Sequence, residues 1–63
     1  MKWEKIGKIQ VARGKIGKFV IEPVRSGLYK ATYSSDYHSF ILPFKKSIKD
    51  LKTMCQNNHY WED

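Results

Sequence analysis

Polar and apolar residues alternate along much of the chain, from Ile6 to about Ser34. A period of two places successive side chains on opposite faces of a strand, and Gly-rich or Ser-rich segments separate the runs at the spacing of a meander. The pattern predicts four antiparallel strands, over residues 5–12, 18–24, 28–34 and 37–44, joined by turns at 13–17, 25–27 and 34–36. Pro23 and Pro43 stand near strand ends, where a residue without an N–H is tolerated.

The sequence Lys-Ile-Gly-Lys occurs twice, at residues 5–8 and 15–18. In the strand prediction the first copy opens one arm of the first hairpin and the second copy completes the turn into the other arm. We therefore interpret the repeat as two parts of one hairpin and not as a duplicated binding motif. The same prediction places Lys8 and Lys18 on one face, with Arg13 and Lys15 at the hairpin tip.

After Phe44 the period becomes helical. Ser47 followed by Asp50 resembles a capping box with Asp in place of Glu, and Ile48, Leu51 and Cys55 then recur at helical spacing. A helix over about residues 47–58 is expected, with its apolar stripe packed on the sheet.

The predicted fold class is α+β: one domain, residues 1–63, with a four-stranded antiparallel meander at about 5–44 and one C-terminal helix packed on one face. The side chains expected under the helix are Ile9, Val11, Phe19, Ile21, Tyr29, Ala31, Tyr33, Phe40 and Leu42. The face left open is expected to present Lys8, Gln10, Lys18, Val20, Glu22, Lys30, Thr32, Ser39 and Ile41.

Composition adds a strong positive charge to this picture. The 63 residues include 12 Lys and Arg against 6 Asp and Glu, a net charge of +6, and the excess lies mostly before residue 26. Such a charge favours anionic partners, although it also serves solubility alone. A chain this short builds a small core, so self-association as a homodimer stays open.

Two kinds of nucleic-acid contact are compatible with a sheet. Single strands need exposed aromatic rings for base stacking, whereas a duplex needs cationic strands that reach phosphates or a groove. The aromatic residues of the strands fall on the face assigned to the core, which favours duplex DNA bound through the basic hairpin and the open face. The candidate DNA-binding residues are Lys8, Arg13, Lys15, Lys18, Arg25 and Lys30. The alternative partner is an acidic host protein.

Aromatic residues at both ends are the candidates for a protein interface. Trp3, Tyr60 and Trp61 are large side chains on segments that otherwise fray, and they are expected to close the core. If exposed, they form a hot spot for a partner or for a second copy.

Catalysis, a metal and a cofactor are not expected. Cys55 and His59 are spaced i, i+4 and His38 could add a third ligand, but a structural zinc site needs four ligands. One cysteine forms no internal disulfide, and no apolar stretch approaches the ~20 residues of a membrane span. The expected setting is therefore the cytoplasm, without membrane attachment.

The chain resembles small phage and prophage accessory proteins, through Trp3, Phe19-Val20-Ile21, the run Leu28-Tyr29-Lys30-Ala31-Thr32-Tyr33 and a helix ending near His59. Residues 18–58 are more loosely similar to the three-stranded arm-binding domains of tyrosine integrases, from which this chain departs by an added front strand and by retaining only Lys45-Lys46 before the helix. The resemblance implies a DNA-binding accessory protein in a bacterial host cytoplasm; the alternative is an inhibitor or adaptor acting on a host nuclease or defence complex.

Overall fold

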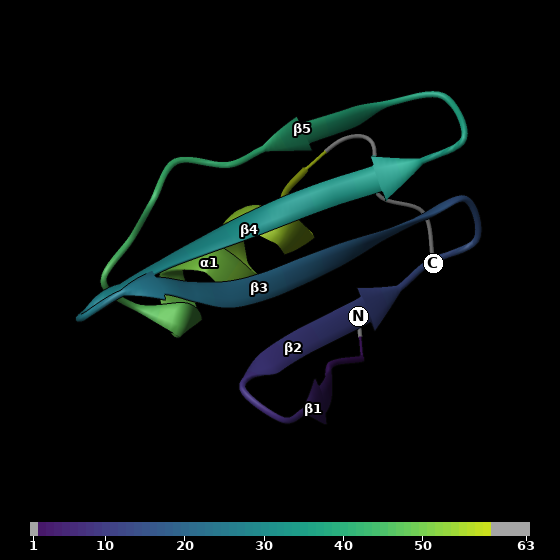
Figure 1. Ribbon diagram of the computed structural model, residues 1–63. Helices are drawn as coiled ribbons and strands as arrows, with labels where there is room; N and C mark the ends of the chain where they lie inside the picture. The colour runs from purple at the N-terminus through teal and green to yellow at the C-terminus, as the bar shows by residue number, and fades with distance from the viewer. Residues whose placement is uncertain (1, 59–63) are drawn as a thin grey trace.

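Five antiparallel strands lie in chain order across one sheet, and one helix follows them (Figure 1). The computed structural model describes residues 2–58. The elements are β1 Glu4–Ile6, β2 Ile9–Arg13, β3 Gly17–Arg25, β4 Leu28–Ser35, β5 Ser39–Ile41 and α1 Ile48–Gln56. The predicted α+β class, an antiparallel meander with a C-terminal helix, is therefore confirmed, with five strands in place of four.

The extra strand comes from a turn inside the predicted first strand. Gly7 has φ +60°, a left-handed conformation that glycine adopts without a steric penalty. The chain reverses there, so that Lys5 pairs with Gln10 and Ile6 with Ile9. The first Lys-Ile-Gly-Lys is thus the end of β1 and its turn, while the second copy leads into β3.

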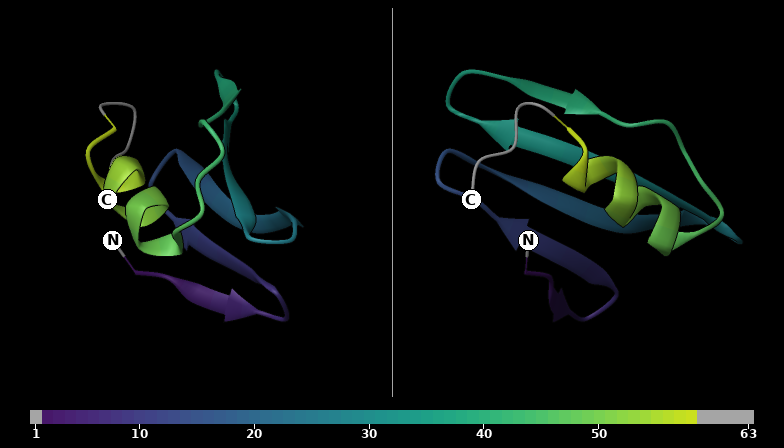
Figure 2. Two further views of the ribbon diagram at one scale, coloured as in Figure 1. Left: turned by 90° about the vertical axis from the view of Figure 1, so that its left-hand side faces the viewer. Right: turned by 180° about the vertical axis from the view of Figure 1, so that it is seen from behind.

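Helix α1 begins where the sequence predicted it. The Ser47 side chain accepts a hydrogen bond from the Asp50 N–H at 3.3 Å, which satisfies one of the unpaired donors of the first turn. The helix lies across one face of the sheet, over β3 and β4 (Figure 2). Its buried residues are Leu51 and Cys55, both on the predicted apolar stripe.

The core lies between α1 and the two long central strands. Phe19, Ile21, Ala31 and Tyr33 are buried there with Leu51 and Cys55, and the rings of Phe19 and Tyr33 are 4.9 Å apart between centroids. Phe40 of β5 stacks on Tyr33 at 5.1 Å, so the shortest strand contributes its aromatic ring to the same cluster. The core residues predicted for β3 and β4 are confirmed.

The face assignment of β2 was wrong. Gln10 pairs with Ile21 and Ala12 with Phe19, which places Gln10 and Ala12 on the helix side. Ile9 and Val11, which were expected under the helix, therefore lie on the uncovered face. Because the side-chain period of a strand is two, a shift of one residue reverses every side chain of the element.

The last strand is shorter than predicted. Only Ser39–Ile41 forms β5, and the chain then follows β4 irregularly, with a Leu42 N–H to Ala31 O bond of 2.8 Å and a bridge between Tyr29 and Lys45. Pro43 lies in this irregular stretch just after Leu42, at a place where a residue without an N–H is tolerated.

Candidate nucleic-acid interface

The β2–β3 hairpin brings three of the predicted cationic residues together at one end of the sheet. Arg13 and Lys18 are directly opposite each other on the two strands, and Lys15 lies in the turn between them. The turn is closed by a hydrogen bond from Gly14 N–H to Gly17 O at 2.8 Å. All three cationic side chains are exposed. We call Arg13, Lys15 and Lys18 the basic corner.

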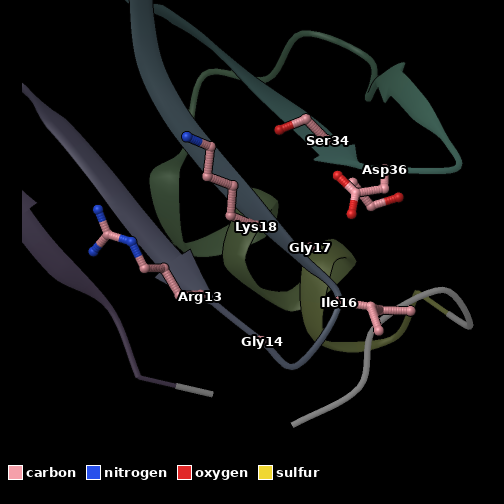
Figure 3. A pocket seen from close by; sticks show the side chains of 8 residues that line it. Arg13, Gly14, Ile16, Gly17, Lys18, Ser34 and Asp36 are labelled. Atoms are coloured by element: carbon pink, nitrogen blue, oxygen red, sulfur yellow. The ribbon is translucent and has the colours of Figure 1, made fainter.

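A shallow hollow of about 390 Å³ opens beside the basic corner. Figure 3 shows Lys18 between Arg13 on one side and Ser34 on the other, in the strand order β2, β3, β4. Asp36 lies on the far side of Gly17 from Arg13 (Figure 3). The polar groups that line the hollow are thus two cations, the hydroxyls of Ser34 and Ser35, and the carboxylate of Asp36.

Two of the candidate cations are paired with acids. Arg13 Nη1 lies 2.8 Å from Glu4 Oε1 across β1 and β2, and Lys30 Nζ lies 3.5 Å from Glu22 Oε1 across β3 and β4. Surface pairs of this kind contribute about 0–1 kcal/mol to stability. An incoming phosphate therefore competes with Glu4 for Arg13 at modest cost.

The other predicted residues lie away from the basic corner. Arg25 is at the end of β3 beside the turn to β4, and Lys8 is in the β1–β2 turn, at the opposite end of the sheet from Lys15. Lys8 borders a separate hollow on the helix side, together with Tyr29 and Ile48. The prediction that Lys8 and Lys18 share the uncovered face was therefore wrong, because the turn at Gly7 ends the first arm before Lys8.

Of the aromatic interface candidates, Trp3 is half-buried and packs against the core cluster. The Lys52 Nζ lies 5.4 Å from the centroid of its ring, within the range of a cation–π contact. Tyr60 and Trp61 lie outside the described residues. Trp3 thus packs against the core, as the sequence predicted, and it does so on the helix side of the sheet.

An apolar row crosses the uncovered face. The sequence interpretation placed Val20, Thr32 and Ile41 on that face but missed Val11. Val11 pairs with Val20, Val20 with Thr32, and Thr32 with Ile41, so these side chains cross four strands on one face. Val11 is 5% exposed and Ile41 59% exposed. The signal for Val11 was its even spacing with Ile9, and we assigned both residues to the wrong side.

Cys55 is fully buried in the core, and burial raises the pKa of its thiol from 9.0 to about 12. Because the thiolate is the nucleophile, the folded protein keeps this sulfur unreactive at neutral pH. Within residues 2–58 there is no group of three or more His, Cys, Asp and Glu residues that could hold a metal ion.

We expect Cys55 to react with iodoacetamide at pH 8 only at the rate at which the domain opens. A folded-state pKa above the unfolded one also means that this thiol stabilises the fold fully below pH 9 and loses that contribution as the pH rises towards 12. Mass spectrometry of labelling with and without urea measures the protection. Rapid labelling of the folded protein would contradict the burial of the sulfur.

No helix within the described residues is long and apolar enough to span a bilayer. Comparison of the whole chain with protein-family models, with curated proteins and with solved structures gave no match.

Proposed function

We propose that this protein is a non-catalytic DNA-binding accessory module that contacts duplex phosphates through the basic corner. The observation that supports this function is the convergence of Arg13, Lys15 and Lys18 on one exposed hairpin end. Lys and Arg contacts to phosphate supply most of the affinity of non-specific DNA binding. The hydroxyl of Ser34 beside Lys18 adds a neutral phosphate ligand of the kind found at such interfaces.

The width of the sheet restricts the mode of binding. Neighbouring strands are about 4.8 Å apart, so five strands span about 19 Å. The major groove of B-DNA is about 12 Å wide. The whole uncovered face therefore does not fit into the groove, whereas the two-stranded end of the β2–β3 hairpin does. This narrows the expected interface from the open face to the basic corner.

We expect the triple variant Arg13→Gln, Lys15→Gln, Lys18→Gln to lose most of its affinity for duplex DNA at low salt. Each phosphate contact that is lost lowers the slope of log K against log salt by about 0.9, so the slope is expected to fall by about 2 to 3. Fluorescence anisotropy with a labelled duplex over a series of salt concentrations measures both quantities.

A matched control variant distinguishes the effect of losing the basic corner from the effect of lowering the net charge. The triple variant Lys45→Gln, Lys46→Gln, Lys49→Gln removes the same charge from the opposite end of the molecule, where Lys45 bridges to Tyr29 and Lys49 lies in the first turn of α1. It is expected to retain most of the salt slope. Equal losses in both triple variants would overturn the basic corner as the site, and no binding at low salt would overturn the function.

The second candidate function is an inhibitor or adaptor that binds an acidic protein of a bacterial host. The apolar row on the uncovered face favours it, because buried apolar surface contributes more to protein–protein than to phosphate contacts. The phage or prophage origin that both functions assume stays a prediction. A stoichiometric partner recovered from a nuclease-treated bacterial lysate would support this candidate, and loss of the partner on nuclease treatment would favour DNA.

A further inference from the structure

Val20 lies at the centre of the face that α1 leaves uncovered. It belongs to β3, the middle strand, and it pairs with Val11 on one side and Thr32 on the other. Ile41 extends the apolar row to β5 and is 59% exposed, while Ile6, at the β1 end of the same face, is 47% exposed. Apolar side chains that cross a sheet in this way are typical of the inner face of a two-sheet sandwich.

Charges flank the apolar row unequally. On β3, Lys18 and Glu22 lie two residues to either side of Val20, and therefore on the same face as Val20. On the Lys18 side the row of opposed residues is Arg13, Lys18, Ser34 and Ser39. On the Glu22 side, Lys30 is the opposed residue and is paired with Glu22 at 3.5 Å. One side of the face is thus cationic and the other contains a carboxylate.

This arrangement selects one way of stacking two copies. A two-fold axis parallel to the strands would place Lys18 against Lys18 of a second copy. A two-fold axis along the apolar row turns the strands end for end, and it places Lys18 against Glu22 of the second copy. In the same arrangement Arg13 meets Ile9 and Lys30 meets Ser34, so no cation faces a cation. Glu4 meets its own counterpart at the sheet edge, but each is paired with Arg13 at 2.8 Å.

We propose that two copies of this chain associate face to face through the row Val11–Val20–Thr32–Ile41, with Lys18 of each copy paired to Glu22 of the other. The association buries Ile41, which is 59% exposed in one copy, and the half-buried Val20, whereas Val11 is already buried at 5% exposure. It adds a second apolar layer to a 63-residue domain. It goes beyond the DNA-binding proposal and does not depend on it, but the two uses of this face compete. Arg13 and Lys18 of the basic corner lie within the dimer interface, and only Lys15, in the turn, lies outside it.

The test is sedimentation velocity over a concentration series, with a charge reversal and its compensation. The wild type is expected to shift from the monomer to the dimer mass as concentration rises. Lys18→Glu places two carboxylates together and is expected to weaken the dimer at least about tenfold. The double variant Lys18→Glu, Glu22→Lys restores opposite charges and is expected to return to within about threefold of the wild type.

Control variants keep the result interpretable. Lys49→Glu makes the same change in net charge on the helix side and is expected to leave the dimer unchanged or slightly tighter. Val20→Lys is expected to abolish it, while Val20→Thr retains it, and circular dichroism verifies that each variant is folded. A wild type that stays monomeric at all concentrations overturns the proposal. The apolar row would then be a contact surface for a different protein. A double variant no tighter than Lys18→Glu overturns the proposed pairing.

Discussion

Leu51→Ala is expected to unfold most of the protein at 37 °C. Leu51 is fully buried between α1 and the central strands, and its neighbours in the core are Phe19, Ile21 and Tyr33. Truncation of a buried leucine typically costs about 2–5 kcal/mol, because the transfer energy is lost and a cavity remains. A single core of this size supplies about 3–5 kcal/mol in total, so one substitution removes most of the stability.

Urea unfolding followed by tryptophan fluorescence measures this loss, at one fixed protein concentration because association would add to the apparent stability. Faster alkylation of Cys55 gives an independent readout, since the same opening exposes that buried thiol. Gln56→Ala, at an exposed position of the same helix, is the matched control and is expected to change stability by less than about 0.5 kcal/mol. A Leu51→Ala variant as stable as this control would show that α1 contributes little to the core.

Gly17→Ala is expected to destabilise the domain more than Gly7→Ala, although both glycines stand in the same Lys-Ile-Gly-Lys sequence. A Cβ atom at Gly17 would lie 2.5 Å from Tyr33 Oη, 2.7 Å from Tyr33 Cζ and 2.8 Å from the Ser34 carbonyl oxygen. Tyr33 is fully buried and stacked on Phe40, so its ring has little room to move. Overpacking of this kind costs about 1–3 kcal/mol or more.

Different compensating substitutions distinguish the cause of destabilisation at the two glycines. A Cβ at Gly7 meets no atom within 4 Å, and its cost comes from φ +60°, about 1–2 kcal/mol for an alanine. Asparagine tolerates that conformation, so Gly7→Asn is expected to be milder than Gly7→Ala. At Gly17 the compensating substitution is Tyr33→Phe, which removes Tyr33 Oη, the atom nearest to the added Cβ. In a thermal-unfolding double-mutant cycle, additive effects of Gly17→Ala and Tyr33→Phe would contradict the contact.

The sequence predicted correctly those features that depend only on residues close together along the chain. Ser47 and Asp50 marked the start of α1, and the alternation of Phe19 and Ile21 identified the buried side of β3. Each signal acts within a few residues along the chain, as capping and strand alternation do. The grouping of Arg13, Lys15 and Lys18 followed in the same way, because one hairpin holds all three.

The face of β2 depended on its neighbours instead. In Ile9-Gln10-Val11-Ala12 the larger apolar side chains alternate with a polar and a small one, and periodicity favours burial of Ile9 and Val11 under the helix. The structure places Ala12 there, directly opposite Phe19, while Trp3 also packs on this side. Large aromatic rings from other segments fill the space, so the small side chain fits. The reversal of β2 adds Ile9 and Val11 to the other face, beside Val20, Thr32 and Ile41, which the alternation of their own strands already predicted there.

The sheet ends, in the described part of the chain, in the three-residue strands β1 and β5. A short outermost strand offers few unpaired N–H and C=O groups, and Pro43, two residues after the end of β5, removes another donor. Neither edge of the sheet therefore offers enough free backbone groups for the strands of other molecules to pair with it and extend a cross-β fibril. Concentrated solutions of this protein are expected to stay free of fibrils, and any assembly to stop at a finite size.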